Sequence, residues 1–478
     1  MIASGSQTSG IHSVRGPAAL QTFVKFFRDP VGLMRDAYRL WGPVSAISSQ
    51  LLPFLPRKRL YVLVVGSELN RRALSDPESF RSSGPIMRGR TRRDSALYRL
   101  SSGLTRESDQ KHQQQRRVVM PAFHKAAVGN YCNAIVATTD RYLEGWSIGQ
   151  SVDMWREIRK LILRIANKTL FELEDPDAAD SLGKMIQEWF ALNFSLLAWL
   201  IPVKLPGLPY CRLHNHAERL ERELLRIISE KRAAATCGSD VLSLLTRAQR
   251  DGAPISDAEL VSQATILFAA SYETTVNALT WTLFLLAQHP SIMADLLDEL
   301  DGTLKGGPPT SDQLDHLPLL EAVIKESMRI LPPVPFIARV ATRPVELGGL
   351  SLRRGDWVAC SIYMTHHLPD LYLEPEQFRP GRWFEINPTP YEYLPFGAGP
   401  YSCIGYNFAT SVIKIALTMI LQRFRLTVVP GVRIDRLVQV TMRPKYGLPM
   451  VLHRQDRQFQ AVRVRGNIHD MVRLTSTS

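Results

Sequence analysis

The feature that most constrains the fold is one long stretch with helical signals at both ends. Ser256-Asp-Ala-Glu259 has the spacing of a capping box, in which a serine hydroxyl satisfies an orphan backbone N–H and a glutamate follows three residues later. The helical pattern continues to Gln288 and is stopped by Pro290. About 32 residues at about 1.5 Å each predict a helix of about 48 Å, which crosses a whole domain. Because its middle is apolar on every side, we expect it to be buried in the core.

Residues 265–287 within this stretch are apolar enough to resemble a membrane span. Glu273 lies near their centre, however, and a charge at the centre of a lipid-facing helix costs several kcal/mol. A buried core helix therefore explains the segment better. Residues 1–16 are polar and small, and they lack the apolar region of a signal peptide. We expect a cytoplasmic protein with no transmembrane anchor.

The rest of the chain predicts a mainly α fold with a minor β part. Helical patterns dominate residues 110–330, and short β-like runs separated by Gly and Pro follow from residue 335. Apolar residues make up 45% of the 478 positions, as in ordinary globular proteins, and no shift in composition marks a second folding unit. We expect one domain over residues 17–452, a flexible segment at 1–16 and a mobile basic tail at 453–478.

The net charge of +13 comes from the first quarter of the chain. Residues 1–125 hold 21 Lys and Arg against 8 Asp and Glu, whereas the remaining 353 residues are neutral. Such an excess of positive charge can bind nucleic acid, an anionic membrane surface or an acidic protein partner. No nucleic-acid-binding signature accompanies it, so we expect no nucleic-acid partner. The five cysteines form no C-x-x-C pair, which argues against a zinc or disulfide scaffold and favours a reducing compartment.

The most informative motif surrounds Cys403. The segment Phe396-Gly-Ala-Gly-Pro-Tyr-Ser-Cys403-Ile-Gly405 places glycines on both sides of one cysteine, just before a predicted helix. Glycines permit close approach of the backbone to a ligand, and N–H groups at a helix start favour a thiolate. A lone cysteine cannot hold zinc, but it suffices as the axial ligand of haem iron. The alternative is a buried structural cysteine.

This segment resembles the haem-binding loop of the cytochrome P450 family, whose pattern is F-G-x-G-x-R-x-C-x-G. Every fixed position matches except one, because Tyr401 stands where the family has an Arg, or sometimes a His, that pairs with a haem propionate. The resemblance implies a cytochrome P450 fold with the long central helix crossing the haem. It also implies haem b (iron protoporphyrin IX) as the cofactor and Cys403 as its axial iron ligand. Phe396, Gly397 and Gly405 would lie against the haem with Tyr401.

The resemblance implies a buried charge network beneath the haem as well. Glu326 and Arg329 have the family's E-x-x-R spacing on a predicted helix, and Arg382 follows in a P-x-x-F-x-P-x-R segment. Glu223-Leu-Leu-Arg226 has the same spacing, and we interpret it as a solvated salt-bridge face. We expect Glu326, Arg329 and Arg382 to be structural residues, because buried ions must be paired.

On the oxygen side, Ala270-Ser-Tyr-Glu273-Thr274-Thr275 in the long helix resembles the family's A/G-G-x-D/E-T-T segment. By this resemblance Ala270 lies against the haem, Thr274 hydrogen-bonds the oxygen ligand and Glu273 passes protons from solvent. Ser271 stands where Gly is usual. A serine hydroxyl in a helix can bond to a carbonyl one turn earlier and bend the helix.

Three further residues resemble the side chains that bind the haem propionates in the family. His112 and Arg116 match its W/H-x-x-x-R helix and share a helix face. Arg339 lies ten residues beyond Arg329, at a position that also reaches a propionate in the family. Since Tyr401 is uncharged, we expect Arg116 and Arg339 to carry more of the anchoring than usual.

The pocket is the least readable part of the sequence. By resemblance, loop 84–105 and the turn near Thr441 contribute to it, together with Phe268, Ala269, Phe336 and Ile337. These side chains are largely apolar, which suits a hydrophobic substrate. The arginines of the loop are either surface charges or contacts for a carboxylate or an acidic carrier: Arg88, Arg90, Arg92, Arg93 and Arg99.

The resemblance covers residues 17–452 and implies a monooxygenase like the soluble bacterial members. It would hydroxylate or epoxidise a hydrophobic small molecule with O2 and two electrons. We expect no flavin or nicotinamide domain, so a separate ferredoxin or flavodoxin would supply the electrons, and we expect a monomer. Part of the basic excess would then meet an acidic donor on the helix at 112–117. Two alternatives stay open: a peroxide-driven hydroxylase or isomerase, and a non-catalytic haem-binding sensor or carrier.

Overall fold

The computed structural model describes residues 6–8, 11–14, 17–48, 59–82, 92, 94–104, 109–173, 176–193, 195, 197–198, 201–233, 238–250 and 252–474. Helices account for most of the regular structure, so the prediction of a mainly α fold with a minor β part is confirmed. The helices are α1 (Pro17–Arg28), α2 (Pro30–Trp41), α3 (Ser67–Ser75), α4 (Ala96–Leu100), α5 (Asp109–Val119), α6 (Lys125–Leu143), α7 (Met154–Phe171), α8 (Pro176–Asn193), α10 (Pro209–Ala233), α11 (Val241–Arg247), α12 (Asp257–Ala287), α13 (Pro290–Leu304), α14 (Ser311–Leu314), α15 (Pro318–Ile330), α16 (Ile362–His366) and α17 (Tyr406–Arg423). Short 3-10 helices are η2 (Met120–Phe123), η3 (Pro380–Phe384), η4 (Gly399–Tyr401) and η5 (Asn467–Asp470).

The main sheet runs in the order β1-β2-β3-β4-β12-β9-β5. Its strands are β1 (Ser6–Thr8), β2 (Ile11–Val14), β3 (Val44–Ser48), β4 (Leu60–Val64), β5 (Phe80–Ser82), β9 (Phe336–Ala341) and β12 (Trp357–Ser361). A second sheet has the order β13-β16-β6, from Phe424–Val428, Pro449–Arg454 and Ser151–Asp153. Three hairpins complete the β part: β7 (Gln249–Arg250) with β8 (Ala253–Pro254), β10 (Val345–Leu347) with β11 (Leu350–Leu352), and β14 (Arg436–Val438) with β15 (Met442–Pro444).

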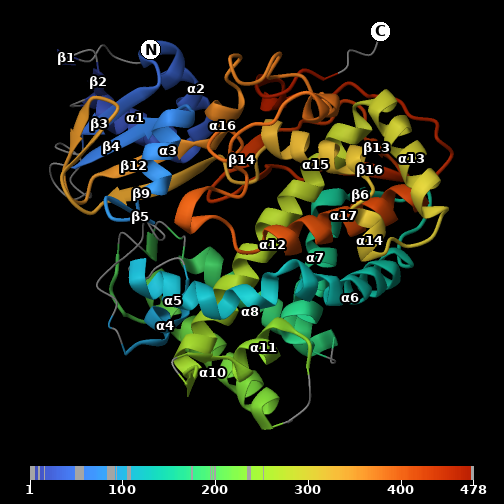
Figure 1. Cartoon of the computed structure of the whole chain (residues 1–478), viewed down its shortest axis with the longest axis horizontal. Coiled ribbons are helices and arrows are strands. Elements are labelled where there is room, and N and C mark those ends of the chain that lie inside the picture. The colour runs from blue at the N-terminus through green and yellow to red at the C-terminus, as the bar shows by residue number, and fades with distance from the viewer. Residues whose placement is uncertain are drawn as a thin grey trace.

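The long helix predicted from the sequence is α12, which spans 31 residues. Ser256 caps it by accepting the Glu259 N–H, whereas the Glu259 carboxylate pairs with Arg250, so only half of the predicted capping box forms. Trp281 and Phe284 are fully buried in its second half. Figure 1 shows α12 running diagonally through the helical part of the molecule, where it packs on α7 and α17. The main sheet lies at the other end, with α1 and α2.

No described helix is long and apolar enough to cross a membrane, so residues 265–287 form a core helix as expected. Most of them are fully buried. The stretch also contains polar residues, which indicate that α12 has a role besides filling the core.

The two ends of the chain differ from the expectation. Within the N-terminal segment that we expected to be flexible, β1 pairs with β2 and β2 extends the main sheet through β3. The mobile C-terminal tail was a wrong expectation for residues 453–474, because Ile468, Met471 and Val472 are fully buried. Arg457 adds ion pairs to Asp298 and Asp301 of α13.

Candidate active site

The loop before α17 is shaped by its glycines. The Cys403 N–H donates to the Phe396 carbonyl at 2.8 Å, which closes the loop. Gly397 and Gly399 have φ of +67° and +72°, a region that L side chains rarely adopt. A Cβ on Gly399 would lie 2.2 Å from the Leu74 carbonyl oxygen at the end of α3, so this glycine lets the loop pack directly on that helix. The loop is therefore held rigidly, with Cys403 just before the helix.

The Cys403 side chain is exposed to solvent, yet enough protein surrounds the sulfur to disfavour a negative charge on it. Burial raises the pKa of the Cys403 thiol, while the Gly405 N–H and the Arg116 charge lower it in part. Arg116 reaches the loop by donating Nη1–H to the Ser402 carbonyl at 2.7 Å. A metal cation deprotonates a coordinating thiol outright, so iron at this sulfur would supply the stabilisation of the thiolate that the protein lacks.

The partner expected for a propionate lies on β9. Arg339 is only 3% exposed, and its Nε lacks a hydrogen-bond partner. Its Nη1 donates to the Ala338 carbonyl at 3.1 Å, and burial lowers its pKa. No carboxylate among the described residues contributes to that pKa. A buried guanidinium in this condition requires an anion, and a haem propionate fits that requirement.

On α12, the accessible residues fall where the sequence motif predicted them. Ala270 and Glu273 are exposed, although the helix is buried on both sides of them. Thr274 donates to the Ala270 carbonyl at 2.7 Å, and Ser271 donates to the Phe268 carbonyl at 3.0 Å. The Ser271 hydroxyl thus bonds back along the helix, as the substitution for Gly suggested.

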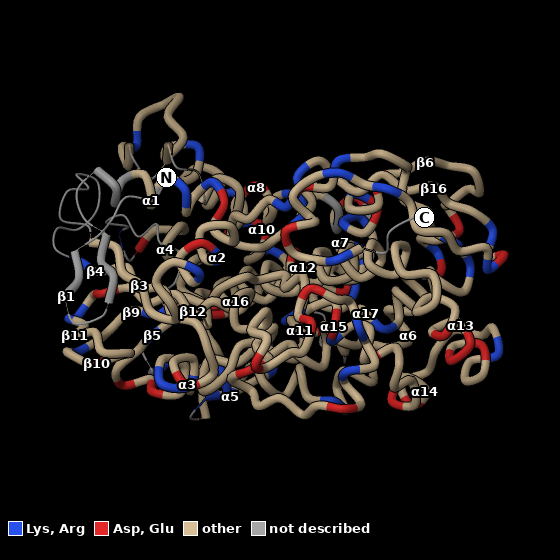
Figure 2. Tube along the Cα trace, turned by 90° about the horizontal axis from the view of Figure 1, so that it is seen from above, with Lys and Arg blue, Asp and Glu red and all other residues tan. Residues whose placement is uncertain are grey.

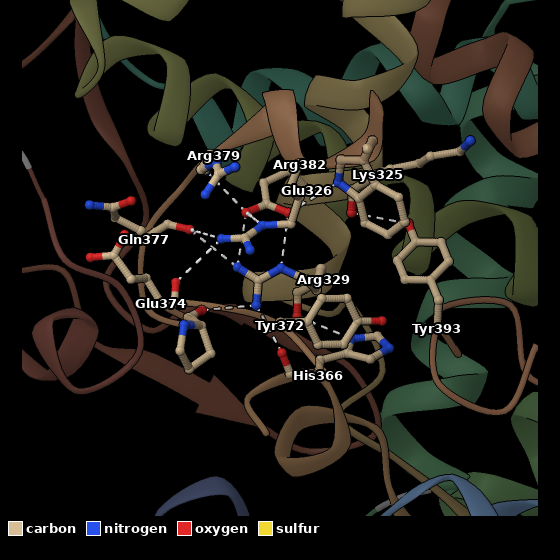
Figure 3. A network of polar contacts seen from close by, with 12 residues as sticks. Lys325, Glu326, Arg329, His366, Tyr372, Glu374, Gln377, Arg379, Arg382 and Tyr393 are labelled. Carbon is tan, nitrogen blue, oxygen red and sulfur yellow. Dashed lines mark hydrogen bonds and ion pairs between the residues drawn. The ribbon is translucent and has the colours of Figure 1, made fainter. Parts of the chain in front are cut away.

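The expected charge network is present and complete (Figure 3). Glu326 is fully buried and accepts from Arg329 Nε and Nη2, each at 2.9 Å, and from Arg382 Nε at 2.9 Å. The Trp383 indole N–H and the Arg379 backbone N–H donate to the same carboxylate at 3.0 Å. Although burial opposes it, these cations and donors hold the pKa of Glu326 below its usual value. The network ties α15 to η3.

A model of the cytochrome P450 family matches residues 54–448. The chain belongs to the cytochrome P450 family. Its fold and its loop, helix and charge network agree with that assignment, and members bind protoporphyrin IX haem through a thiolate. The protein is therefore a cytochrome P450 monooxygenase with haem as its cofactor.

Two similar curated proteins come from Streptomyces species. The chain is 31% identical over 375 residues to cyclooctat-9-en-7-ol 5-monooxygenase of Streptomyces melanosporofaciens, covering 76% of this chain and 80% of the relative. It is 29% identical over 372 residues to pentalenene oxygenase of Streptomyces avermitilis, covering 76% and 81%. Among solved structures, retinoic acid-bound cyanobacterial CYP120A1 is similar with a TM-score of 0.78 at 25% identity, over 90% of this chain and 96% of that one.

The structure corrects part of the predicted substrate pocket of this P450. Phe268 is fully buried, stacked on Phe171 and Tyr272 with ring centroids 5.9 Å apart in each pair, so it faces away from the accessible face of α12. Ala269 is partly accessible, as a pocket residue should be. A helix that is apolar on all sides gives no sequence signal for which face lines the pocket.

Phe336 and Ile337 are neighbours on β9 and therefore point to opposite faces of the sheet. Ile337 lies against the Cys403 loop, within 3.4 Å of where a Cβ on Gly397 would be. Phe336 instead packs against Phe26 and Trp357, with ring centroids 5.4 and 6.1 Å away. Of the two, Ile337 is therefore the one next to the Cys403 loop.

The loop arginines are partly accounted for. Arg99 forms an ion pair with Glu221 of α10, donating Nη2–H at 2.7 Å, and Arg92 pairs with Asp94 at 2.7 Å. These two are engaged with the protein's own carboxylates rather than aimed at a ligand. Arg88, Arg90 and Arg93 lie outside the described residues.

Glu273 lies beside Thr441, from the turn that the resemblance placed at the pocket, and beside Arg443, which the sequence did not reveal. The Glu273 carboxylate accepts from Thr441 at 3.3 Å. Two residues further on, Arg443 lies over the Trp155 ring at 4.9 Å, and Arg159 lies over the same ring at 4.5 Å. The Glu273 charge raises the pKa of Arg443, against a larger lowering by burial. In the sequence, only the i, i+4 spacing of Trp155 and Arg159 on α7 indicates that these two side chains meet. Nothing in the sequence links them to Glu273.

Proposed function

We propose that this cytochrome P450 hydroxylates or epoxidises a hydrophobic small molecule, using O2 and two electrons from a separate ferredoxin or flavodoxin. The observation that carries this proposal is the acid–alcohol pair on α12. Glu273 is exposed and Thr274 partly exposed in a helix that is otherwise buried. A peroxide-driven hydroxylase or an isomerase needs no such pair to pass protons, and neither does a carrier or sensor.

Within this proposal each described site residue has a role. Cys403 is the axial iron ligand, and the haem supplies the activation of oxygen. Arg339, Arg116 and His112 hold the haem propionates, and Arg116 also supports the loop through Ser402. Ala270 offers a small side chain to the haem, as do the loop residues Phe396, Gly397 and Gly405.

The proton path involves this chain's own groups. The Thr274 hydroxyl lies one turn from Ala270, at the accessible part of α12. Glu273 connects that part of the helix to Thr441, on the segment that also carries Arg443. We propose that Glu273 takes protons from this polar side and delivers them toward Thr274.

The substrate class follows from the relatives. Their names record oxygenation of cyclooctat-9-en-7-ol and pentalenene, which are alicyclic, largely hydrocarbon molecules. We propose a substrate of the same terpene-like kind, supported by Ile337 beside the haem-binding loop and by Ala269 on α12.

The electron donor is proposed to dock at α5. Lys111 and Arg117 are exposed there, on the helix whose other face carries buried His112 and half-buried Arg116. In Figure 2, α3 and α5 lie along the same edge of the molecule, and Lys and Arg colour both. An acidic ferredoxin or flavodoxin matches this surface. We also propose that the enzyme acts as a monomer in the cytoplasm, where its described cysteines stay unpaired.

The first test compares the reduced, carbon monoxide-bound spectra of the wild type and Cys403→Ser. We expect a thiolate spectrum in the wild type and its loss in the variant; a thiolate spectrum in both would refute the ligand. Turnover of alicyclic hydrocarbons with NADPH, ferredoxin and ferredoxin reductase is the second test. Turnover with hydrogen peroxide alone would favour the peroxide-driven alternative. Spectral shifts without any turnover would favour the carrier or sensor.

A further inference from the structure

Three side chains from separate elements form a column at the position where this chain departs from its family. Tyr401, from η4, takes the place of the family's loop cation. The His112 ring of α5 lies 4.4 Å from the Tyr401 ring, with an interplanar angle of 40°. The Arg339 guanidinium of β9 lies over the Tyr401 ring at 5.1 Å. The column therefore joins α5, the Cys403 loop and the main sheet.

Two of the three side chains in the column are buried. His112 and Arg339 are 4% and 3% exposed. A tyrosine ring face attracts a guanidinium, and the attraction grows when water is excluded. The ring thus fixes the plane of the guanidinium, and the Ala338 carbonyl fixes Nη1. Nε remains without a partner, so the edge of a fixed fork is left for an anion.

We propose that Tyr401 is a positioning residue for the haem propionate site: its ring, backed by His112, orients the Arg339 guanidinium so that Arg339 supplies the charge that the family draws from the loop. This inference rests on the proposed function, in which Arg339 binds a propionate. It assigns the contribution of Tyr401 to the ring face rather than to the hydroxyl.

The position of Arg339 over the Tyr401 ring predicts that a cation at position 401 is unfavourable. A cation at position 401 would enter the space over which the Arg339 guanidinium lies. Two like charges that close together repel, and the burial of Arg339 leaves little water to screen them. Tyr401→Arg restores the family pattern, yet in this chain it removes the ring and adds a repelling charge. It should therefore weaken haem binding instead of strengthening it.

The test is the rate of haem transfer from each variant to excess apomyoglobin, followed by absorbance. We expect Tyr401→Phe to release haem within about twofold of the wild-type rate. Tyr401→Leu and Tyr401→Arg should release it about tenfold faster, the factor expected for a lost cation–π contact that is partly desolvated. In an Arg339→Gln background, Tyr401→Leu should add little, because the ring would have no guanidinium left to orient.

Three results would overturn the inference. Release by Tyr401→Phe as fast as by Tyr401→Leu would show that the hydroxyl acts. Slower release by Tyr401→Arg than by the wild type would show that the site lacks charge. An unchanged rate in Tyr401→Leu would show that the ring does nothing. Should Tyr401→Leu fail to fold, by far-ultraviolet circular dichroism, the comparison of Phe with Arg decides alone.

Failure of the proposed function looks different. If Arg339 does not bind haem, Arg339→Gln itself leaves the transfer rate unchanged. If Cys403 is not the ligand, Cys403→Ser keeps the thiolate spectrum. If only the inference about Tyr401 is wrong, Arg339→Gln accelerates haem release and Cys403→Ser loses the thiolate spectrum, while the Tyr401 variants depart from the expected order.

Discussion

Replacing Glu326 with Gln should destabilise the protein far more than its small change in shape suggests. Glu326 is the buried counter-ion of both Arg329 and Arg382, which are 0% and 2% exposed. Gln keeps the volume but leaves two buried guanidinium groups with no negative charge between them. Its NH2 group also cannot accept the N–H bonds that one carboxylate oxygen now accepts. Breaking a buried ion pair in this way costs about 3–5 kcal/mol.

A loss of that size is a large share of the roughly 5–15 kcal/mol by which a domain is normally stable. Urea unfolding followed by far-ultraviolet circular dichroism measures it, with haem content of the purified protein as a second readout. We expect a much lower midpoint and poor haem incorporation in Glu326→Gln.

The chain supplies a matched control with the same E-x-x-R spacing. Glu223 pairs with Arg226 at 2.7 Å on α10, but the two side chains are 30% and 48% exposed. Surface pairs contribute about 0–1 kcal/mol, so Glu223→Gln should scarcely move the midpoint. Equal effects of the two substitutions, or a wild-type midpoint with an unchanged slope in Glu326→Gln, would refute the reasoning.

Three further predictions concern pH, proton delivery and the electron donor. Burial lowers the pKa of His367 to about 3 from 6.5, so only the unfolded chain takes up a proton between these values. Stability should therefore fall by up to about 1.4 kcal/mol per pH unit as the pH drops from 6.5 toward 3, and urea midpoints of His367→Gln should fall less steeply. Glu273→Gln should lower product formed per O2 consumed and raise the solvent isotope effect on turnover, while Glu259→Gln at the start of α12 leaves both unchanged. Reduction by an acidic ferredoxin should slow as salt rises, and Arg117→Glu should slow it at low salt but little at high salt; salt-independent rates would contradict docking at α5.

The sequence predicted best where a local rule decides the outcome. Ser256 and Pro290 delimit α12 because a cap and a helix-breaking ring act on their own neighbours. The Cys403 loop was equally legible, since Gly397 and Gly399 take backbone angles that few other residues adopt. The role of Glu326 was assigned by resemblance and needed the fold to show its burial.

Prediction failed where orientation or distant packing decides. Phe268 was assigned to the pocket by resemblance, and the sequence could not correct this because a helix that is apolar on every side carries no period that reveals its inner face. The tail after residue 453 looked mobile because its average composition is polar and basic. A few apolar side chains, Ile468, Met471 and Val472, suffice to hold it once a complementary surface exists.

The surroundings of Glu273 show why an active-site motif alone underdetermines the chemistry. The motif places an acid beside Thr274, but Thr441 and Arg443 face that acid from a hairpin near the end of the chain. Arg159 of α7 acts on Arg443, whose pKa is lowered by burial and also by this charge, and it donates to the Tyr272 hydroxyl at 3.1 Å. Both guanidinium groups lie over the Trp155 ring, which is itself fixed to α12 by donating to Asn277 at 3.0 Å. The charge around Glu273, the proposed proton relay, is thus set by segments more than 100 positions away, so a substitution at Arg443 should change the pH dependence of turnover without touching the motif.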